Sequence, residues 1–191
     1  MKNMGEVTYV LGIKIERDRS RGYFGLSQKA YIDKVLKRYD MAHCKPGEAP
    51  VIKGDIFRKS QPEKEVSAEI FKEYASAVGS IMYAMVCLRP DISFIAGMLG
   101  RYQQNPSWIH WQAVKKVLRY LKRTRDFILV YMRSDTLEIV GYTDSDLGDI
   151  DDRKSTLGYV FIAVQDAASW KSRKQQTFIH IIGAYFSVSS S

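Results

Sequence analysis

The stretch that decides the fold of this chain is Gly141-Tyr142-Thr143-Asp144-Ser145-Asp146. It joins the end of a predicted strand to a run of aspartates. The apolar residues 137–140 are typical of a β-strand, and five carboxylates fall between residues 144 and 152. Carboxylate oxygens suit Mg²⁺ or Mn²⁺, and two such ions can clamp a phosphoryl transfer. A solvated, Asp-rich turn is the alternative. An EF-hand calcium loop is excluded, since Ser155 stands where that loop needs a glutamate.

The composition is that of a globular protein, with 46% hydrophobic and 12% aromatic residues in a chain of 191. Cys44 and Cys87 are the only cysteines, so we expect no disulfide framework and a reducing, intracellular compartment, either cytoplasm or nucleus. The longest apolar run, residues 81–88, is too short to span a membrane, and no signal sequence opens the chain. We therefore expect no membrane and no small-molecule substrate as partners.

The net charge of +8 is unevenly distributed along the chain. Residues 105–133 carry 7 basic and 1 acidic side chains, a net +6, whereas residues 134–191 carry 5 and 8, a net −3. A basic segment next to an acidic one is what a nucleic-acid site needs, because cations hold the phosphate backbone and carboxylates hold metal ions. Chance clustering produces the same asymmetry, so charge alone does not decide the function.

The first 41 residues predict a hairpin followed by a helix. Residues 8–15 alternate between two faces as one half-buried strand does, and residues 23–26 follow a polar turn as its partner. Ser27 is a suitable N-cap for a helix that ends near Tyr39. Periodicity then disappears over residues 42–64, which three prolines and two glycines interrupt, and we interpret this segment as a linker between domains.

Three helices are predicted between residues 65 and 126. Ser67 is a plausible N-cap of the first, Pro90 suits the first turn of the second, and Asn105-Pro106 begins the third, which ends near Thr124. The third helix places its basic side chains away from its apolar stripe, and the segment 92–125 contains no acidic residue. We interpret this face of helix 107–124 as a ladder for the nucleic-acid backbone, with a plain solvated surface as the alternative. The ladder consists of Lys115, Lys116, Arg119, Lys122 and Arg123.

The C-terminal third predicts short strands joined by polar turns. Apolar runs at residues 127–133, 137–143, 159–164 and 168–171 favour an antiparallel meander. Together with the hairpin and the helices, they predict an α+β fold.

Several motifs occur in a fixed order over most of the chain. They are Met1-Lys2-Asn3-Met4-Gly5-Glu6, Tyr9-Val10-Leu11-Gly12-Ile13, Leu26-Ser27-Gln28, Gly79-Ser80-Ile81-Met82-Tyr83, Arg89-Pro90-Asp91-Ile92, Tyr120-Leu121-Lys122, the opening stretch 141–146, Asp151-Asp152-Arg153-Lys154-Ser155-Thr156, Gly158-Tyr159-Val160-Phe161 and Ser169-Trp170-Lys171-Ser172. In this order they resemble the Pol polyprotein of copia-type LTR retrotransposons, from the end of its reverse transcriptase to the start of its ribonuclease H domain.

The resemblance implies a division of the chain. Residues 1–41 would be the end of the polymerase palm, whose hairpin positions the primer, and residues 42–64 the linker. Residues 65–126 would be the helical thumb and connection region, and residues 127–191 the N-terminal half of a ribonuclease H-like β-meander. The implied partner is an RNA–DNA hybrid or a duplex, held through its backbone.

The resemblance also implies that the chemistry is incomplete. Asp144 matches the first metal-binding carboxylate of ribonuclease H, on the central strand, and the implied cofactor is Mg²⁺. The polymerase Tyr-Val-Asp-Asp pair is absent, and Asp166 is the only acidic residue after Asp152. A glutamate-bearing helix is expected where residues 178–186 contain no carboxylate, and Leu147-Gly148 is one residue shorter than the family's loop.

Three hypotheses follow from these residues. The first is a Pol fragment that is inactive on its own, in which Asp144 is the relic of a catalytic and metal site. The second is a stand-alone, sequence-independent nucleic-acid-binding module that uses helix 107–124. The third is a decaying gene product whose apolar residues 178–188 promote aggregation.

Overall fold

The structure is a computed structural model that describes residues 6–51, 67–136, 138–146, 156–164, 166–174 and 184–189. The described residues form four α-helices, one 3₁₀ helix and two antiparallel sheets, which confirms the predicted α+β class. The helices are α1 (Lys29–Arg38), α2 (Ala68–Leu88), η1 (Pro90–Ile92), α3 (Ser93–Gly100) and α4 (Trp108–Arg123). The strands are β1 (Tyr9–Val10), β2 (Ile13–Asp18), β3 (Tyr23–Ser27), β4 (Ile128–Met132), β5 (Glu138–Asp146), β6 (Thr156–Ala163), β7 (Asp166–Lys174) and β8 (Ala184–Ser189).

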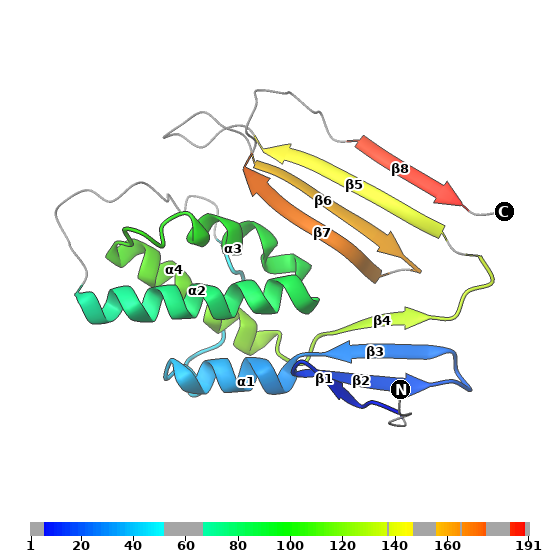
Figure 1. Cartoon of the computed structure of the whole chain (residues 1–191), viewed down its shortest axis with the longest axis horizontal. Coiled ribbons are helices and arrows are strands. Elements are labelled where there is room, and N and C mark those ends of the chain that lie inside the picture. Colours follow the sequence, from blue (N-terminus) through cyan, green and yellow to red (C-terminus); the bar gives the residue numbers. More distant parts are fainter. Residues whose placement is uncertain are drawn as a thin grey trace, which may run out of the picture.

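The two sheets lie beside the helices, and one edge of each faces the other (Figure 1). The first sheet has the order β1-β2-β3-β4 and the second the order β7-β6-β5-β8. The facing edge strands are β4 and β7, and α3 and η1 pack alongside β7 of the second sheet. This arrangement leaves β5, which carries Asp144, in the interior of its sheet.

The N-terminal strand is shorter than the sequence predicts. The alternation over residues 8–15 predicts one strand, but the chain reverses at Leu11 and Gly12, whose φ angles are 49° and 78°. A two-residue turn with two positive φ angles is the geometry of a tight hairpin. It pairs Val10 with Ile13, so Tyr9 and Ile13 lie on opposite faces of the hairpin and not on the same face as one strand would place them. The hydroxyl of Tyr83 in α2 donates a hydrogen bond to the carbonyl of Leu11, which ties the turn to the helices.

A hairpin partner and a helix follow β2 where the sequence predicts them, but the predicted N-cap Ser27 is wrong by one residue. Asp18 pairs with Tyr23 across the polar turn, where Gly22 has a φ of 63°. The α1 helix begins at Lys29, whose backbone N–H donates to the hydroxyl of Ser27 over 3.3 Å. Ser27 therefore supports the start of the helix, although Gln28 is the capping residue.

The predicted meander begins one strand later than the sequence suggests. The run at residues 127–133 forms β4, but β4 pairs with β3 in the first sheet instead of with β5. Only β5, β6 and β7 form the meander, and β8 pairs with the other side of β5. The sequence shows that β4 is a strand, but not that its partner lies about a hundred residues earlier in the chain.

Asp166 joins the two sheets. Its Oδ2 accepts the backbone N–H of Val130 in β4 over 2.7 Å, and its Oδ1 accepts its neighbour's backbone N–H over 2.8 Å. The hydroxyl of Tyr131 donates to the carbonyl of Ala167 over 2.6 Å at the same junction. These bonds satisfy polar groups on two strand edges that would otherwise remain open.

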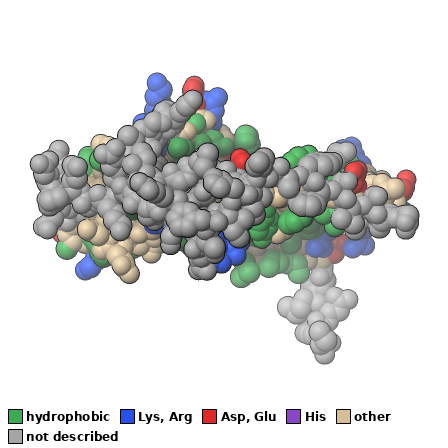
Figure 2. All heavy atoms as spheres, turned by 90° about the horizontal axis from the view of Figure 1, so that it is seen from above, with side chains coloured by type: hydrophobic (Ala, Val, Ile, Leu, Met, Phe, Trp, Pro, Cys, Tyr) green, Lys and Arg blue, Asp and Glu red, His purple; other side chains and the backbone are tan. Residues whose placement is uncertain are grey.

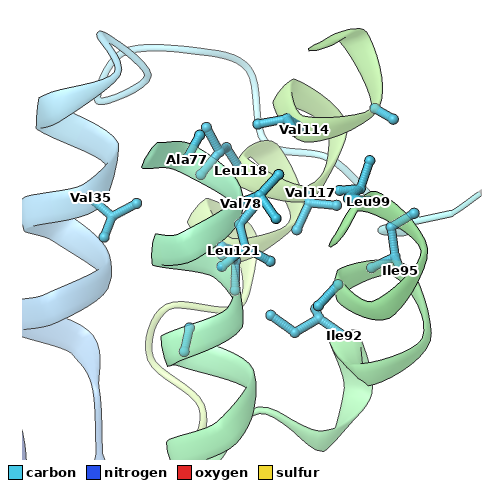
Figure 3. Close-up of a cluster of buried hydrophobic side chains, with 14 of the residues drawn as sticks. Val35, Ala77, Val78, Ile92, Ile95, Leu99, Val114, Val117, Leu118 and Leu121 are labelled. Atoms are coloured by element: carbon cyan, nitrogen blue, oxygen red, sulfur yellow. The ribbon is translucent and has the colours of Figure 1, made fainter. Parts of the chain in front are cut away.

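The hydrophobic core lies between the helices (Figure 3). Val35 of α1 faces Ala77 and Val78 of α2, while Val114, Val117, Leu118 and Leu121 of α4 and Ile92, Ile95 and Leu99 of η1 and α3 complete it. Residues before and after the predicted linker thus share this core, and the domain boundaries at 42, 65 and 127 stay predictions. None of the described helices combines the length and apolar character that a membrane span needs.

A buried arginine fixes the junction of α2, η1 and α4. The Arg89 side chain is 4% exposed, and its Nε and Nη2 donate to the two oxygens of Asp91 over 2.9 and 2.6 Å. It also donates to the carbonyl and hydroxyl of Thr124 at the end of α4, over 3.3 and 2.5 Å. The rings of Tyr120 and Phe127 lie 5.5 and 5.9 Å from the guanidinium carbon, and the Tyr120 hydroxyl donates to Asp91.

Replacing Arg89 by Met should lower the free energy of unfolding by about 3 kcal/mol, because the partly buried carboxylate of Asp91 then loses its cation. Urea denaturation followed by circular dichroism measures this difference. A loss below about 0.5 kcal/mol, the size of a surface effect, would contradict the structural role of the pair.

The Asp91 pair also predicts a dependence on pH. Burial alone would raise the pKa of Asp91, but the hydrogen bonds and charge of Arg89 outweigh it and hold that pKa below its ordinary value. A depressed carboxyl pKa stabilises the fold above the unfolded pKa of about 3.9, and this stabilisation is lost as the pH falls through the folded pKa. The stability gap between wild type and Asp91→Asn should therefore be full at pH 7 and shrink below about pH 4. A gap that does not change with pH would contradict this assignment.

Asp166→Ala should destabilise the fold by about 1–2 kcal/mol, because it leaves the N–H of Val130 without its charged acceptor. Asp135→Ala is the matched control, since Asp135 is an exposed carboxylate in the turn after β4. Thermal unfolding of both variants compares them, and equal melting temperatures would show that Asp166 does not join the sheets.

Candidate nucleic-acid interface

The basic helix α4 is fixed at its start by a capping box. Ser107 caps the helix, and the Nδ1 atom of His110 accepts the backbone N–H of Ser107 over 2.9 Å. His110 is fully buried and stacks on Tyr102 with ring centroids 3.9 Å apart. The histidine is therefore a capping and packing residue, as its place at the helix start suggests.

The ladder on α4 borders a cavity. Lys115, Lys116 and Arg119 line a space of about 490 Å³ together with Gln112 and Lys45, and Met41 and Cys44 close it on the side of the chain that follows α1. Four cations thus surround one concave space. Such a concentration of positive charge suits an anionic group, and a phosphate is the anion that a Lys–Arg ladder binds in nucleic acids.

The other two ladder residues have partners within the chain. The Nζ atom of Lys122 donates to the carbonyl of Cys44 over 2.5 Å, and an Arg123 nitrogen lies 3.8 Å from a carboxylate oxygen of Glu48. The backbone N–H of Gly47 donates to the carbonyl of Arg119 over 3.0 Å, and a Cβ on Gly47 would lie 3.1 Å from the Cβ of Arg119. This part of the ladder therefore holds residues 44–48 against α4.

Sequence reasoning missed Lys45 and Gln112. Lys45 lies in the segment interpreted as a linker, where no periodicity predicts what it faces. Gln112 carries no charge, although it lies one helical turn from the ladder. Its position three residues before Lys115 is the signal that could have placed it at the cavity.

Lys115 packs on two tryptophans. Its ammonium lies 5.8 Å from the ring centroid of Trp108 and 5.4 Å from that of Trp111. Cation–π contact of this kind holds the ammonium near the cavity instead of letting it extend into water. Trp108 remains 40% exposed, so an aromatic surface borders the cations.

The basic cavity is a local feature of the surface. On the face shown in Figure 2, the described Lys and Arg side chains stand in several separate places, with hydrophobic side chains between them. The described residues of that face thus form no continuous basic patch.

Asp144 lies on β5, opposite Gly158 of β6. Its side chain is exposed and has no hydrogen bond or ion pair with the described residues. It borders a cleft of about 670 Å³ between the second sheet and the segment of η1 and α3. Asp91 borders the same cleft, but it is bound to Arg89.

The described carboxylates do not make a two-metal site. Among the residues that the structure describes, no group of three or more His, Cys, Asp and Glu side chains could hold a metal ion. Asp166 accepts two backbone N–H groups at the junction of the sheets, and Asp149, Asp151 and Asp152 lie outside the described residues. The described carboxylates therefore do not fit the Mg²⁺ site that the resemblance implies.

The helix implied after β7 is not found where the structure describes that segment. Residues 184–189 form β8, which is antiparallel to β5, with Ala184 opposite Thr143. Residues 175–183 lie outside the described part of the chain. Tyr185, Phe186 and Val188 are residue types that favour a strand, which is the physical reason for the difference.

Known proteins match this chain along most of its length. The retrovirus-related Pol polyprotein from transposon TNT 1-94 of Nicotiana tabacum is 43% identical over 182 residues, which are 92% of this chain and 14% of that protein. The corresponding polyprotein from transposon RE2 of Arabidopsis thaliana is 33% identical over 177 residues, again 92% of this chain and 12% of that protein. The secreted RxLR effector protein 161 of Plasmopara viticola is 47% identical over 105 residues, 54% of this chain and 74% of the effector.

No protein-family model matches the chain, and no solved structure matches it. The chain spans only about a seventh of the length of the tobacco polyprotein, so it corresponds to one part of such a protein. The ordered motifs and the matches to transposon polyproteins from two plants agree with each other. The chain therefore belongs to the Pol polyprotein family of copia-type retrotransposons.

Proposed function

We propose that this chain is the part of Pol in which the reverse transcriptase ends and the ribonuclease H domain begins. On its own it is catalytically inactive and binds a duplex or an RNA–DNA hybrid through the phosphate backbone. The cavity with four cations between α4 and residues 41–45 is the observation that carries this proposal.

The cavity fits sequence-independent binding. Its cations are Lys45, Lys115, Lys116 and Arg119, and none of the described residues that line it is acidic. Contacts of Lys and Arg with phosphate oxygens position a protein on nucleic acid without reading its sequence, which is what a copying enzyme requires. The contact between Gly47 and Arg119 keeps one wall of the cavity at a fixed place on the helix.

The motif order supports the assignment to the end of the polymerase and the start of ribonuclease H. The resemblance implies that Asp144 stands on a central strand, and β5 has strands on both sides. The hairpin of β1 and β2, which would position the primer, carries exposed apolar side chains at Tyr9, Val10 and Leu11. An exposed apolar tip is unusual for a free surface and fits a contact with a partner.

Catalytic inactivity rests on the carboxylates. Polymerase chemistry in the family needs an aspartate pair that the sequence lacks, and ribonuclease H chemistry needs about four converging carboxylates. Among the described residues that line the cleft, Asp144 is the one carboxylate without an ion pair, because Asp91 is bound to Arg89. Asp144 is in this proposal a vestigial catalytic and metal-binding residue.

A stand-alone binding module is the second candidate. The alignment with the Plasmopara effector covers 74% of that protein, so a related segment makes up most of a protein much shorter than Pol. This favours a segment that functions outside a polyprotein, with the cavity on α4 as its binding site.

Changing Lys45, Lys115 and Arg119 together to Gln should weaken duplex binding at least tenfold at low salt. Each lost phosphate contact should reduce the slope of log K against log salt by about 0.9, so the slope should fall by about 2 to 3. Fluorescence anisotropy with a labelled duplex and a labelled RNA–DNA hybrid measures both quantities.

The matched control changes Lys34, Lys37 and Arg38 to Gln, which removes the same charge from the exposed face of α1. This triple variant should retain most of the affinity. Equal losses for the two triple variants would show that binding depends on net charge alone, which would contradict the assigned site.

The purified chain should not cleave an RNA–DNA hybrid in the presence of Mg²⁺, because the described carboxylates do not converge on a metal. Gel analysis of a labelled hybrid tests this, with an active ribonuclease H as the positive control. Mg²⁺-dependent cleavage that Asp144→Asn abolishes would refute the proposed inactivity.

A further inference from the structure

The basic cavity on α4 occupies only a short part of the helix. Of the ladder residues, Lys115, Lys116 and Arg119 line it, and they span about 6 Å of the helix axis. The two later ladder residues are bound to the segment 44–48 within the chain. The cations that line the cavity therefore surround one space instead of following a backbone past several phosphates.

A fourth cation reaches the cavity from another part of the chain. Lys45 belongs to the segment that follows α1, and the backbone bond between Gly47 and Arg119 holds this segment on the helix. Positive charges that a fold brings together repel one another, and an anion placed among them removes this repulsion. The cavity is therefore suited to a single anion of high charge.

A phosphate at the end of a strand matches these donors better than a phosphate within it. An internal phosphate carries one negative charge, whereas a phosphate monoester carries about −1.5 to −2 at pH 7 and presents three acceptor oxygens. Ammonium and guanidinium groups make short, strong hydrogen bonds to such an ionised acceptor. The volume of about 490 Å³ is within the range of small-ligand sites, so a phosphate enters with its sugar, whereas an uninterrupted backbone only crosses the opening.

An exposed aromatic side chain stands beside the cations. Trp108 is 40% exposed, and its ring centroid lies 5.8 Å from the ammonium of Lys115. The last base of a strand has one face that no neighbouring base covers, and aromatic side chains stack on such faces. Trp108 therefore favours a nucleic-acid end over inorganic phosphate or a phosphorylated peptide.

We propose that the cavity on α4 binds the terminal phosphate of a nucleic-acid strand. The four cations hold the phosphate oxygens, and the last base stacks on Trp108. This inference rests on the proposed nucleic-acid binding and narrows it, because it gives the cavity a preference for strand ends over internal backbone.

Three duplexes with an internal fluorescent label separate the end from the backbone. The first has phosphorylated 5′ ends, the second has the same sequence with hydroxyl ends, and the third has hydroxyl ends and enough further base pairs to match the added charge. Anisotropy with the whole chain should show about tenfold tighter binding of the first than of the second, because the end adds charge and an acceptor oxygen. The third should bind like the second. Equal affinities for the first and the third would overturn the proposal.

Changing Lys45, Lys115 and Arg119 together to Gln should abolish the difference between phosphorylated and hydroxyl ends. The matched triple variant on α1, whose residues do not line the cavity, should keep it. Lys45→Gln alone, at an exposed position outside the helices, should reduce the difference and provides the test if the triple variant does not melt cooperatively. A difference that persists undiminished in these cavity variants would show that the ends bind elsewhere.

The two free cysteines report occupancy of the cavity directly. Cys44 lines it and Cys87 of α2 does not, and both side chains are partly exposed. A nucleoside 5′-monophosphate at millimolar concentration should slow alkylation of Cys44 by iodoacetamide and leave that of Cys87 unchanged. The nucleoside without its phosphate should slow neither. Peptide mass spectrometry measures both rates in one sample, and an unprotected Cys44 would contradict the proposal.

The outcomes distinguish this inference from the proposed function. If the triple cavity variant weakens binding of every duplex but the wild type does not prefer phosphorylated ends, the proposed backbone site stands and this inference fails. If the variant leaves all affinities unchanged, the backbone site fails as well. Protection of Cys44 by inorganic phosphate or by a phosphoserine peptide that equals protection by the nucleoside monophosphate would overturn the strand end as the occupant.

Discussion

The buried guanidinium of Arg89 is the constraint on which both candidate sites depend. A charge that is 4% exposed must be neutralised within the protein, and Asp91 and Thr124 are the groups within reach. Asp91 belongs to η1, which begins one wall of the cleft, and Thr124 ends α4, which carries the basic ladder. Because both groups bind the same guanidinium, the position of the ladder relative to the cleft is fixed. Phe127 packs on the same guanidinium, and the chain continues from Phe127 into β4.

Local signals predict α2 and α4 well, because each of these helices begins after a serine cap and has a distinct apolar face. Ser67 and Ser107 cap α2 and α4, and the stripes of both helices face the shared core. The reversal at Leu11 is missed because the alternation of residues 8–15 is also typical of one continuous strand, in which Val10 and Ile13 would lie on opposite faces instead of pairing. The pairing of β4 with β3 is invisible for a different reason. Packing between residues far apart in the sequence determines this pairing, and local strand propensity does not predict it.

The sequence predicts the positive charge of the candidate site on α4, but not which residues line its cavity. The ladder on α4 follows from helical spacing alone, but Lys122 and Arg123 are used within the chain while Lys45 joins the cavity from a segment without periodicity. A list of basic residues on one helix therefore differs from the set that can reach a phosphate. The backbone contact between Gly47 and Arg119 accounts for the difference, because it brings residues 44–48 onto the helix.

Three aspartates show how environment separates residues that look alike in sequence. Asp91 is bound to a buried cation, Asp166 accepts two backbone N–H groups between the sheets, and Asp144 alone is exposed with no described partner. The first two stabilise the fold, so their carboxylates are not available to a metal. The third is exposed opposite Gly158, so its carboxylate remains accessible at the surface. The sequence shows all three only as aspartates, and the groups that the fold places around each one decide whether its carboxylate stabilises the structure or stays accessible.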